Sequence, residues 1–196
     1  MSHFSVLVIG DNVDEQLAPY IYEPEEIGEN YNPKAKWDWY EVWGRWSGEL
    51  IVKQGVKPEG IKFTPFNSDE FREIMIKENR ANTALMKDID MDKMKESVIK
   101  ETEKIYDDIK NNAPYIIFNP NFISNTERDY VNNHTKEEFV EKYYPGIFNF
   151  SAIVKDWIWH ENHSEHGDYE DWNKQVEKLI SNLHPDTRLT VIDCHI

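Results

Sequence analysis

An apolar run early in the chain most strongly limits the folds that this sequence can adopt. The segment from His3 to Gly10 reads HFSVLVIG, is rich in β-branched residues, and is too short for a stable isolated helix. Such a run is typical of a strand buried on both faces near the centre of a sheet. Two later runs, Phe148 to Val154 and Leu189 to Ile192, predict further buried strands. Trp157 and Trp159 are expected to continue the middle strand, with both side chains on one face.

Helical patterns lie between these runs. Asn67 and Glu70 have the spacing of a capping box, and apolar residues recur at steps of three or four from Met91 to Ile109. Thr135 and Glu138 repeat the capping-box spacing before another helix. A last helix is predicted from about Tyr169 to Asn182, and polar loop at 119–134.

The order of these elements predicts an α+β fold with a mixed, mainly antiparallel sheet covered by helices. We expect a single domain over residues 1–196, because no repeat or Gly/Ser linker marks a boundary. The helical segment at about 67–112 is predicted to be an insertion in that domain. The alternating aromatic residues from Trp37 to Lys53 predict two strands joined by a bend or a glycine bulge.

Composition indicates a protein of the cytoplasm. The chain is 39% hydrophobic and 13% aromatic, which argues against disorder. No run of about 18 apolar residues is present, and Met1 to Gly10 lacks the pattern of a signal peptide. The one cysteine, Cys194, fits a reducing compartment. We therefore expect no association with a membrane.

The net charge of −15 is concentrated in two segments. Residues 1–31 carry seven acidic residues and no Lys or Arg, and residues 156–171 carry six acidic residues and no Lys or Arg. These segments are either solvated loops or a negative surface for a basic protein partner. Direct binding of nucleic acid is not expected, because phosphate contacts need a basic footprint.

A cluster of aromatic residues is the densest candidate for a binding site. Four tryptophans, a tyrosine and an arginine fall within ten residues. Aromatic rings and a guanidinium can hold a nucleobase or anchor a protein interface. The other interpretation is that the tryptophans form core and Arg45 pairs with a carboxylate. Strand alternation places Trp37, Trp39 and Trp43 on one face. The members of the cluster are Trp37, Trp39, Tyr40, Trp43, Arg45 and Trp46.

Two other patterns contain chemically active side chains. His160, His163 and His166, with Asp168, have spacing that a divalent metal could use, but their acidic surroundings favour a solvated loop, so we predict no bound metal and no cofactor. Near the end of the chain, Cys194 and His195 point to opposite faces of a strand and cannot form a dyad, whereas Asp193 and His195 share a face and could form a pair. The common nucleotide-binding and hydrolase motifs are absent from the sequence.

Several sequence blocks resemble a family of tailed-bacteriophage proteins of uncharacterised function. They are the start MSHFSVLVIGD, the nearby EQLAPY, the block NPKAKWDWYEVWGRWSG, the stretch LMKDIDMDKMKE and the ending LTVIDCHI. In that family the tryptophan block usually reads Gly-Gly-Arg-Trp, whereas Trp43 replaces the first glycine here. The resemblance implies a phage accessory protein that acts in the host cytoplasm, and it supplies no catalytic residues.

From this resemblance we expect a protein that binds and inhibits a host defence protein with a basic surface. Its binding surface would combine the tryptophan cluster with Glu23, Glu25 and Glu26, since charge that steers a basic partner lies beside rings that can anchor it. This expectation favours a binding protein over an enzyme. The alternative is a protein that binds or hydrolyses a nucleotide signal, with Trp39, Tyr40, Arg45 and Trp46 holding the base and the phosphate.

Overall fold

The computed structural model describes residues 3–22, 32–63, 68–113, 124–162 and 170–196. Contacts divide the chain into two compact units. The first contains residues 1–90, 150–162 and 179–196, and the second contains residues 91–149 and 163–178.

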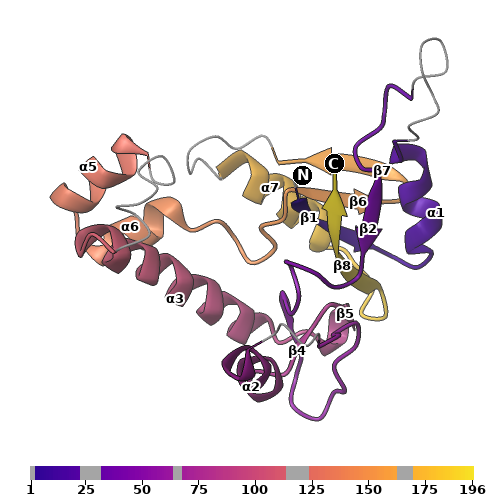
Figure 1. Cartoon of the computed structure of the whole chain (residues 1–196), viewed down its shortest axis with the longest axis horizontal. Helices are drawn as coiled ribbons and strands as arrows, with labels where there is room; N and C mark the ends of the chain where they lie inside the picture. Colours follow the sequence, from indigo (N-terminus) through magenta and orange to yellow (C-terminus); the bar gives the residue numbers. More distant parts are fainter. Residues whose placement is uncertain (1–2, 23–31, 64–67, 114–123, 163–169) are drawn as a thin grey trace. The chain divides into compact units, whose positions relative to one another are not determined.

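The first unit is built on a six-stranded mixed sheet (Figure 1). Its main path runs β2-β8-β1-β6-β7, and β5 also pairs with β8. Among the strand pairings of this sheet in the described residues, that of β1 with β6 is parallel and the others are antiparallel, which confirms the predicted mixed, mainly antiparallel sheet and the α+β class. The strands are β1 (His3–Ile9), β2 (Trp39–Glu41), β5 (Thr83–Leu85), β6 (Ala152–Lys155), β7 (Ile158–Glu161) and β8 (Arg188–His195).

The predicted central strand lies between two others and is buried. Val6, Leu7 and Val8 are fully inaccessible to solvent. Side chains on one face of the sheet pack in an apolar cluster with Leu17 of α1 (Val13–Leu17) and Tyr20 of η1 (Ala18–Tyr20). These two short helices therefore cover that face of the first unit.

The segment at 67–112 contains the two helices that its patterns predict, but it also contains short strands between them, so it is not helical throughout. Helix α2 (Asp69–Lys77) is capped by Ser68, whose side chain accepts a hydrogen bond from the Phe71 backbone, and not by the predicted Asn67. Two short strands and a 3-10 helix then precede α3 (Met91–Lys110): β4 (Arg80–Ala81), β5 and η3 (Met86–Asp88). The periodicity of apolar residues did not indicate these strands, because they are only two and three residues long.

The Trp37 to Lys53 segment contains two strands joined by a bend, as predicted, but the two strands belong to different sheets. β2 pairs with β8 of the large sheet, whereas β3 (Leu50–Ile51) pairs with β4 in a separate two-stranded sheet. Between β2 and β3 the chain turns at Gly44 and Gly48, which both have positive φ.

The strand predicted at Phe148 to Val154 begins only at Ala152, and its predicted extension through Trp157 and Trp159 does not continue it. β6 stops at Lys155, and Asp156 and Trp157 form a two-residue turn with φ values of 52° and 60°. β7 then returns antiparallel to β6, so the single extended run that we predicted is a hairpin. Positive φ at both turn positions is the geometry of a type I′ turn, whose twist matches that of the strands.

The second unit is helical. It contains α3, α5 (Asn125–Asn133), α6 (Lys136–Tyr143) and most of α7 (Glu170–Ile180). Tyr106 and Ile109 of α3 form a core with Val131, Phe139 and Tyr143. Thr135 and Glu138 form the predicted capping box, but α5 was predicted as loop and has its own box at Ser124 and Glu127. No helix in the described part of the chain is long and apolar enough to cross a membrane.

Candidate functional site

Polar side chains gather on one face of the large sheet, where β1, β2 and β8 meet. His3 lies opposite His195 and Ser5 opposite Asp193, while Glu41 of β2 lies opposite Asp193 on the other side. Directly opposed residues project to the same face. The pairing therefore collects both histidines and two carboxyl groups on the face opposite the α1 cluster.

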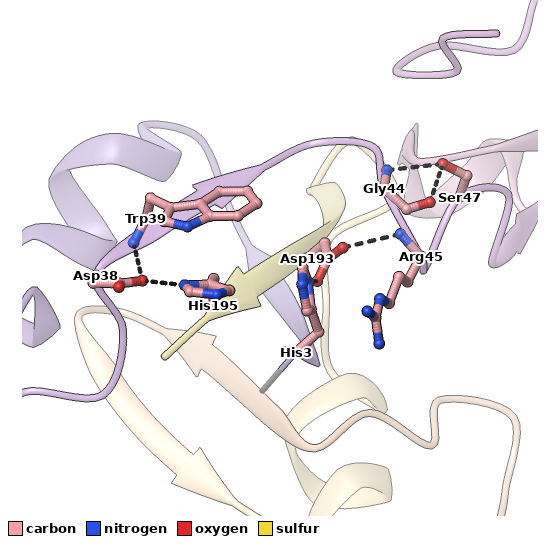
Figure 2. Close-up of polar contacts among 8 residues, drawn as sticks. All are labelled: His3, Asp38, Trp39, Gly44, Arg45, Ser47, Asp193 and His195. Carbon is pink, nitrogen blue, oxygen red and sulfur yellow. Dashed lines mark hydrogen bonds and ion pairs between the residues drawn. The ribbon is translucent and has the colours of Figure 1, made fainter. Parts of the chain in front are cut away.

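The first histidine–carboxylate pair joins β1 to β8 (Figure 2). His3 Nδ1 lies 3.0 Å from Asp193 Oδ1, and the other carboxylate oxygen of Asp193 accepts a 2.9 Å hydrogen bond from the Arg45 backbone N–H. Asp193 is only 1% exposed. A buried carboxylate is costly unless it is paired, so these two contacts fix Asp193 and hold the His3 ring in place.

The second pair lies beside the first (Figure 2). His195 Nδ1 lies 2.7 Å from Asp38 Oδ1, which also accepts a 2.8 Å bond from the Trp39 backbone N–H. The centroids of the His3 and His195 rings are 5.0 Å apart, with an interplanar angle of 75°. Two carboxylate-supported imidazoles are thus close enough for one small group to contact both.

The hydrogen bonds determine what each ring can do. An ionised carboxylate only accepts hydrogen bonds, so Nδ1 of each histidine must be the donor. Each neutral ring then has its lone pair on Nε2 and can take a proton, and each protonated ring can give one. Nε2 of His195 is buried and has no hydrogen-bond partner among the described residues. Leaving such an atom unsatisfied costs about 1 to 3 kcal/mol, and a catalytic role is one recognised reason for keeping it.

The loop after β2 is held against β8 by a buried asparagine. The Asn82 side chain accepts a 2.7 Å bond from the Gly48 N–H and donates to the Trp46 carbonyl. Within the loop, the Ser47 hydroxyl donates to the Gly44 carbonyl and accepts from the Gly44 N–H. These bonds place the Arg45 N–H at Asp193 and leave the Arg45 side chain exposed.

Trp39 lies over the second pair. Its ring stacks on His195 at 4.8 Å with an interplanar angle of 20°, and it meets His3 edge-on. Trp39 is nevertheless 43% exposed. Part of the indole that His195 does not cover therefore faces solvent immediately beside both histidines.

Charges around the site are mixed. Burial, and secondarily the nearby Asp193 carboxylate, raises the pKa of Glu41, while Lys62 acts against this shift. The Lys62 ammonium lies 3.3 Å from the centroid of the Trp43 ring. Arg45 and Lys62 thus supply positive charge at an edge where Asp38 and Asp193 are already paired with histidines.

The raised pKa of Glu41 leads to a pH-dependent prediction. The folded state favours protonated Glu41, so ionising it costs stability as the pH rises through the ordinary Glu pKa of 4.5 toward the raised pKa of the folded state. We expect Glu41→Gln to increase the free energy of unfolding at pH 7, by less than about 1 kcal/mol because the side chain is partly solvated. The gain should vanish below pH 4.5.

Urea unfolding at both pH values checks this expectation. Glu73→Gln on α2 is the matched control, because it removes an exposed carboxylate far from Glu41 in the sequence. A loss of stability at pH 7 in Glu41→Gln would contradict the assignment.

The predicted tryptophan cluster divides between core and site. Trp37 is 6% exposed and packs edge-on against Tyr40 in the α1 cluster, so it is not on the binding surface that we predicted. Tyr40 donates a hydrogen bond to Asp14, and burial, followed by Asp14, raises its pKa. The alternation prediction was wrong for Trp37 because it precedes β2 and bridges to Ile21 instead.

The other members of the predicted surface have different positions. Trp43 lies under Lys62, Trp46 is half-buried with its carbonyl bonded to Asn82, and Trp39 and Arg45 reach the histidine site. Glu23, Glu25 and Glu26 lie outside the described residues. Among the described members of the predicted set, Trp39 and Arg45 join the site described here.

The predicted histidine-rich loop is described only at its start. His160 is on β7, and burial, then Lys155, lowers its pKa. His163, His166 and Asp168 lie outside the described residues. Within the described ranges, no group of three or more His, Cys, Asp or Glu side chains is arranged to hold a metal ion.

The predicted Asp193–His195 pair also needs correction. The two residues do share a face, but each bonds to a residue from another strand or loop, His3 and Asp38. Cys194 points into the opposite core, where burial raises its pKa well above the ordinary range. Sequence reasoning missed His3 and Asp38, although polar His3 and Ser5 at alternate positions of an apolar strand already marked one polar face.

Comparison of this chain with protein-family models, curated proteins and solved structures finds no match.

Proposed function

We propose that the chain is a phosphodiesterase that uses His3 and His195 as a general acid–base pair. The observation that carries the proposal is the juxtaposition of two imidazoles, each supported through Nδ1 by its own carboxylate. General acid–base catalysis needs one group that accepts a proton and one that donates a proton at the same reacting centre. Two neighbouring rings with different partners meet that requirement.

Phosphoryl chemistry fits this arrangement better than acyl transfer. An acyl-transfer site needs a nucleophile hydrogen-bonded to its base. No such Ser or Cys contact with His3 or His195 occurs in the described residues, and Cys194 is on the other face. Displacement at phosphorus depends mainly on positioning, charge and two proton transfers, which the histidines and Arg45 can provide.

The proposed step is balanced as a hydrolysis. One neutral histidine takes a proton from water as the water oxygen bonds to phosphorus. The other histidine is protonated and donates its proton to the leaving oxygen as the bond between that oxygen and phosphorus breaks. The products are a phosphomonoester and an alcohol, and proton exchange with water restores the starting forms of the two rings.

The test is the appearance of phosphomonoester by 31P NMR. The purified chain is incubated with two diesters, glycerophosphocholine and the deoxydinucleotide d(ApA). Turnover of at least one diester that rises and then falls with pH supports the proposal, since one ring must be neutral and the other protonated. No monoester from either diester at any pH between 5 and 9 would rule the proposal out.

The expected inhibitor of a basic host protein is a second candidate, supported by the β6–β7 turn. Trp157 is 52% exposed although its φ is positive, a strained conformation for a bulky residue. Its backbone is held by the Tyr20 hydroxyl, which donates to the Trp157 carbonyl at 2.8 Å. Strain that the surrounding structure enforces is typical of functional positions, and acidic Asp156 beside an exposed ring suits a basic partner.

We expect Trp157→Gly to stabilise the fold by about 1 kcal/mol relative to Trp157→Ala, because only glycine adopts this conformation without strain. Thermal unfolding of both variants measures the difference. If Trp157 anchors a host protein, both variants should lose inhibition to the same extent. Equal stability of the two variants would argue against strain at this turn.

A further inference from the structure

We infer that the substrate of the histidine site is a small nucleotide whose base stacks on Trp39 while its phosphodiester meets His3 and His195. This inference rests on the proposed phosphodiesterase function and names its substrate class.

The position of the indole is the first argument. Trp39 contacts both catalytic rings, stacking on His195 and meeting His3 edge-on at 5.8 Å. Its 43% exposure is high for a tryptophan that packs on a buried histidine. A base that stacks on the exposed indole surface lies next to the two histidine rings, so the phosphodiester attached to its sugar would lie at the edge of this cluster.

The neighbouring charges are the second argument. Arg45 is exposed in the loop whose backbone N–H is bound to Asp193, and Figure 2 shows its side chain extending from that loop beside the first histidine pair. Lys62 acts on Glu41 in the same region. The Lys62 ammonium lies over the Trp43 ring. An exposed guanidinium in the loop bound to Asp193 suits a ligand that carries phosphate oxygens.

The charge of the whole chain limits the size of the nucleotide. The net charge is −15, which opposes long-range attraction of a polyanion. A mono- or dinucleotide has few phosphates and can be held by local contacts alone. The inference is therefore a small nucleotide rather than a DNA or RNA strand.

The experiment separates base recognition from catalysis. Wild type, Trp39→Leu and Trp39→Phe are assayed by 31P NMR with d(ApA), which has bases, and with glycerophosphocholine, which has no aromatic ring. Stacking of one base contributes about 1 to 3 kcal/mol, equivalent to roughly 5- to 150-fold in affinity. Trp39→Leu should lower kcat/KM for d(ApA) at least about fivefold more than for glycerophosphocholine, mainly through KM, and Trp39→Phe should restore most of the loss.

Phe63→Leu, which removes another exposed ring of the first unit, is the control and should keep the wild-type preference. Thermal unfolding of each variant identifies any variant that fails to fold. If a variant fails to fold, its kinetic comparison is replaced by a binding measurement on the wild type, namely the quenching of tryptophan fluorescence by d(ApA).

The outcomes distinguish the two proposals. Cleavage of both diesters with the same efficiency, and an equal effect of Trp39→Leu on both, would overturn the nucleotide inference while leaving the phosphodiesterase proposal intact. Binding of d(ApA) that depends on Trp39, without cleavage of either diester, would overturn the phosphodiesterase proposal while leaving a nucleotide site. Failure of d(ApA) to quench fluorescence or to be cleaved would overturn the nucleotide inference.

Discussion

Replacing His195 with asparagine should lower the rate of phosphodiester hydrolysis by about 10²- to 10⁴-fold, the usual contribution of a positioned acid or base. The asparagine amide nitrogen can take the place of Nδ1 and keep the bond to Asp38, which is 2.7 Å long in the parent chain. What the variant lacks is Nε2, the atom that transfers the proton. The loss should appear in kcat with d(ApA), and KM should change little.

A second variant keeps this result interpretable. His3→Asn should give a loss of similar size, and the double variant should be little worse than either single one, because residues that act as a unit are not additive. His184 is the matched control, since it is an exposed histidine 3.7 Å from a carboxylate, that of Asp186. His184→Asn should retain wild-type kcat. Retained kcat in His195→Asn with a normal melting temperature would refute the assigned role.

Gly44→Ala should destabilise the protein by about 3 kcal/mol or more and disorganise the first histidine pair. A Cβ atom at this position would lie 2.4 Å from Asp193 Oδ2 and 2.8 Å from Glu41 Oε1. In addition, the Gly44 φ of +120° is a conformation that other residues rarely adopt, with a strain of about 1 to 3 kcal/mol. Because Asp193 is bonded on both oxygens, it cannot move aside without losing His3 or the Arg45 N–H.

Gly55 separates the two causes of this loss. It also has positive φ, at +88°, but a Cβ there would meet nothing within 4 Å. Gly55→Ala therefore reports backbone strain alone, and urea unfolding should show a clearly smaller loss than in Gly44→Ala. Equal losses would mean that the contact with Asp193 contributes nothing to stability.

The sequence predicted the buried parts of the sheet better than its edges. The apolar runs in β1, β6 and β8 have a strong local signal, because a strand buried on both faces must be apolar throughout. β2, β4 and β5 are only two or three residues long and are fixed by their partners. Helix α5 is polar enough to resemble a loop, and its capping box, Ser124 with Glu127, was the one local signal of its start.

For a related reason, only part of the candidate site could be predicted from the sequence. Asp193 and His195 share a face by strand alternation alone. Their hydrogen-bond partners, His3 and Asp38, are determined by the strand register and by the position of the loop before β2. No local sequence pattern specifies either of these. Trp37 and Trp39 are likewise two residues apart, yet one enters the core and the other the site, because the strand begins only at Trp39.

The pairing of β1 with β8 also sets when the site can exist during synthesis. His3 and Asp193 are 190 positions apart in sequence, so their contact closes a very long loop. While the ribosome is adding the preceding residues, β1 has no β8 to pair with, and His3 has no carboxylate partner there. Contacts of such high sequence separation form slowly. The histidine pairs should therefore form only after β8 has left the ribosome, and until then the apolar strand β1 is exposed to aggregation.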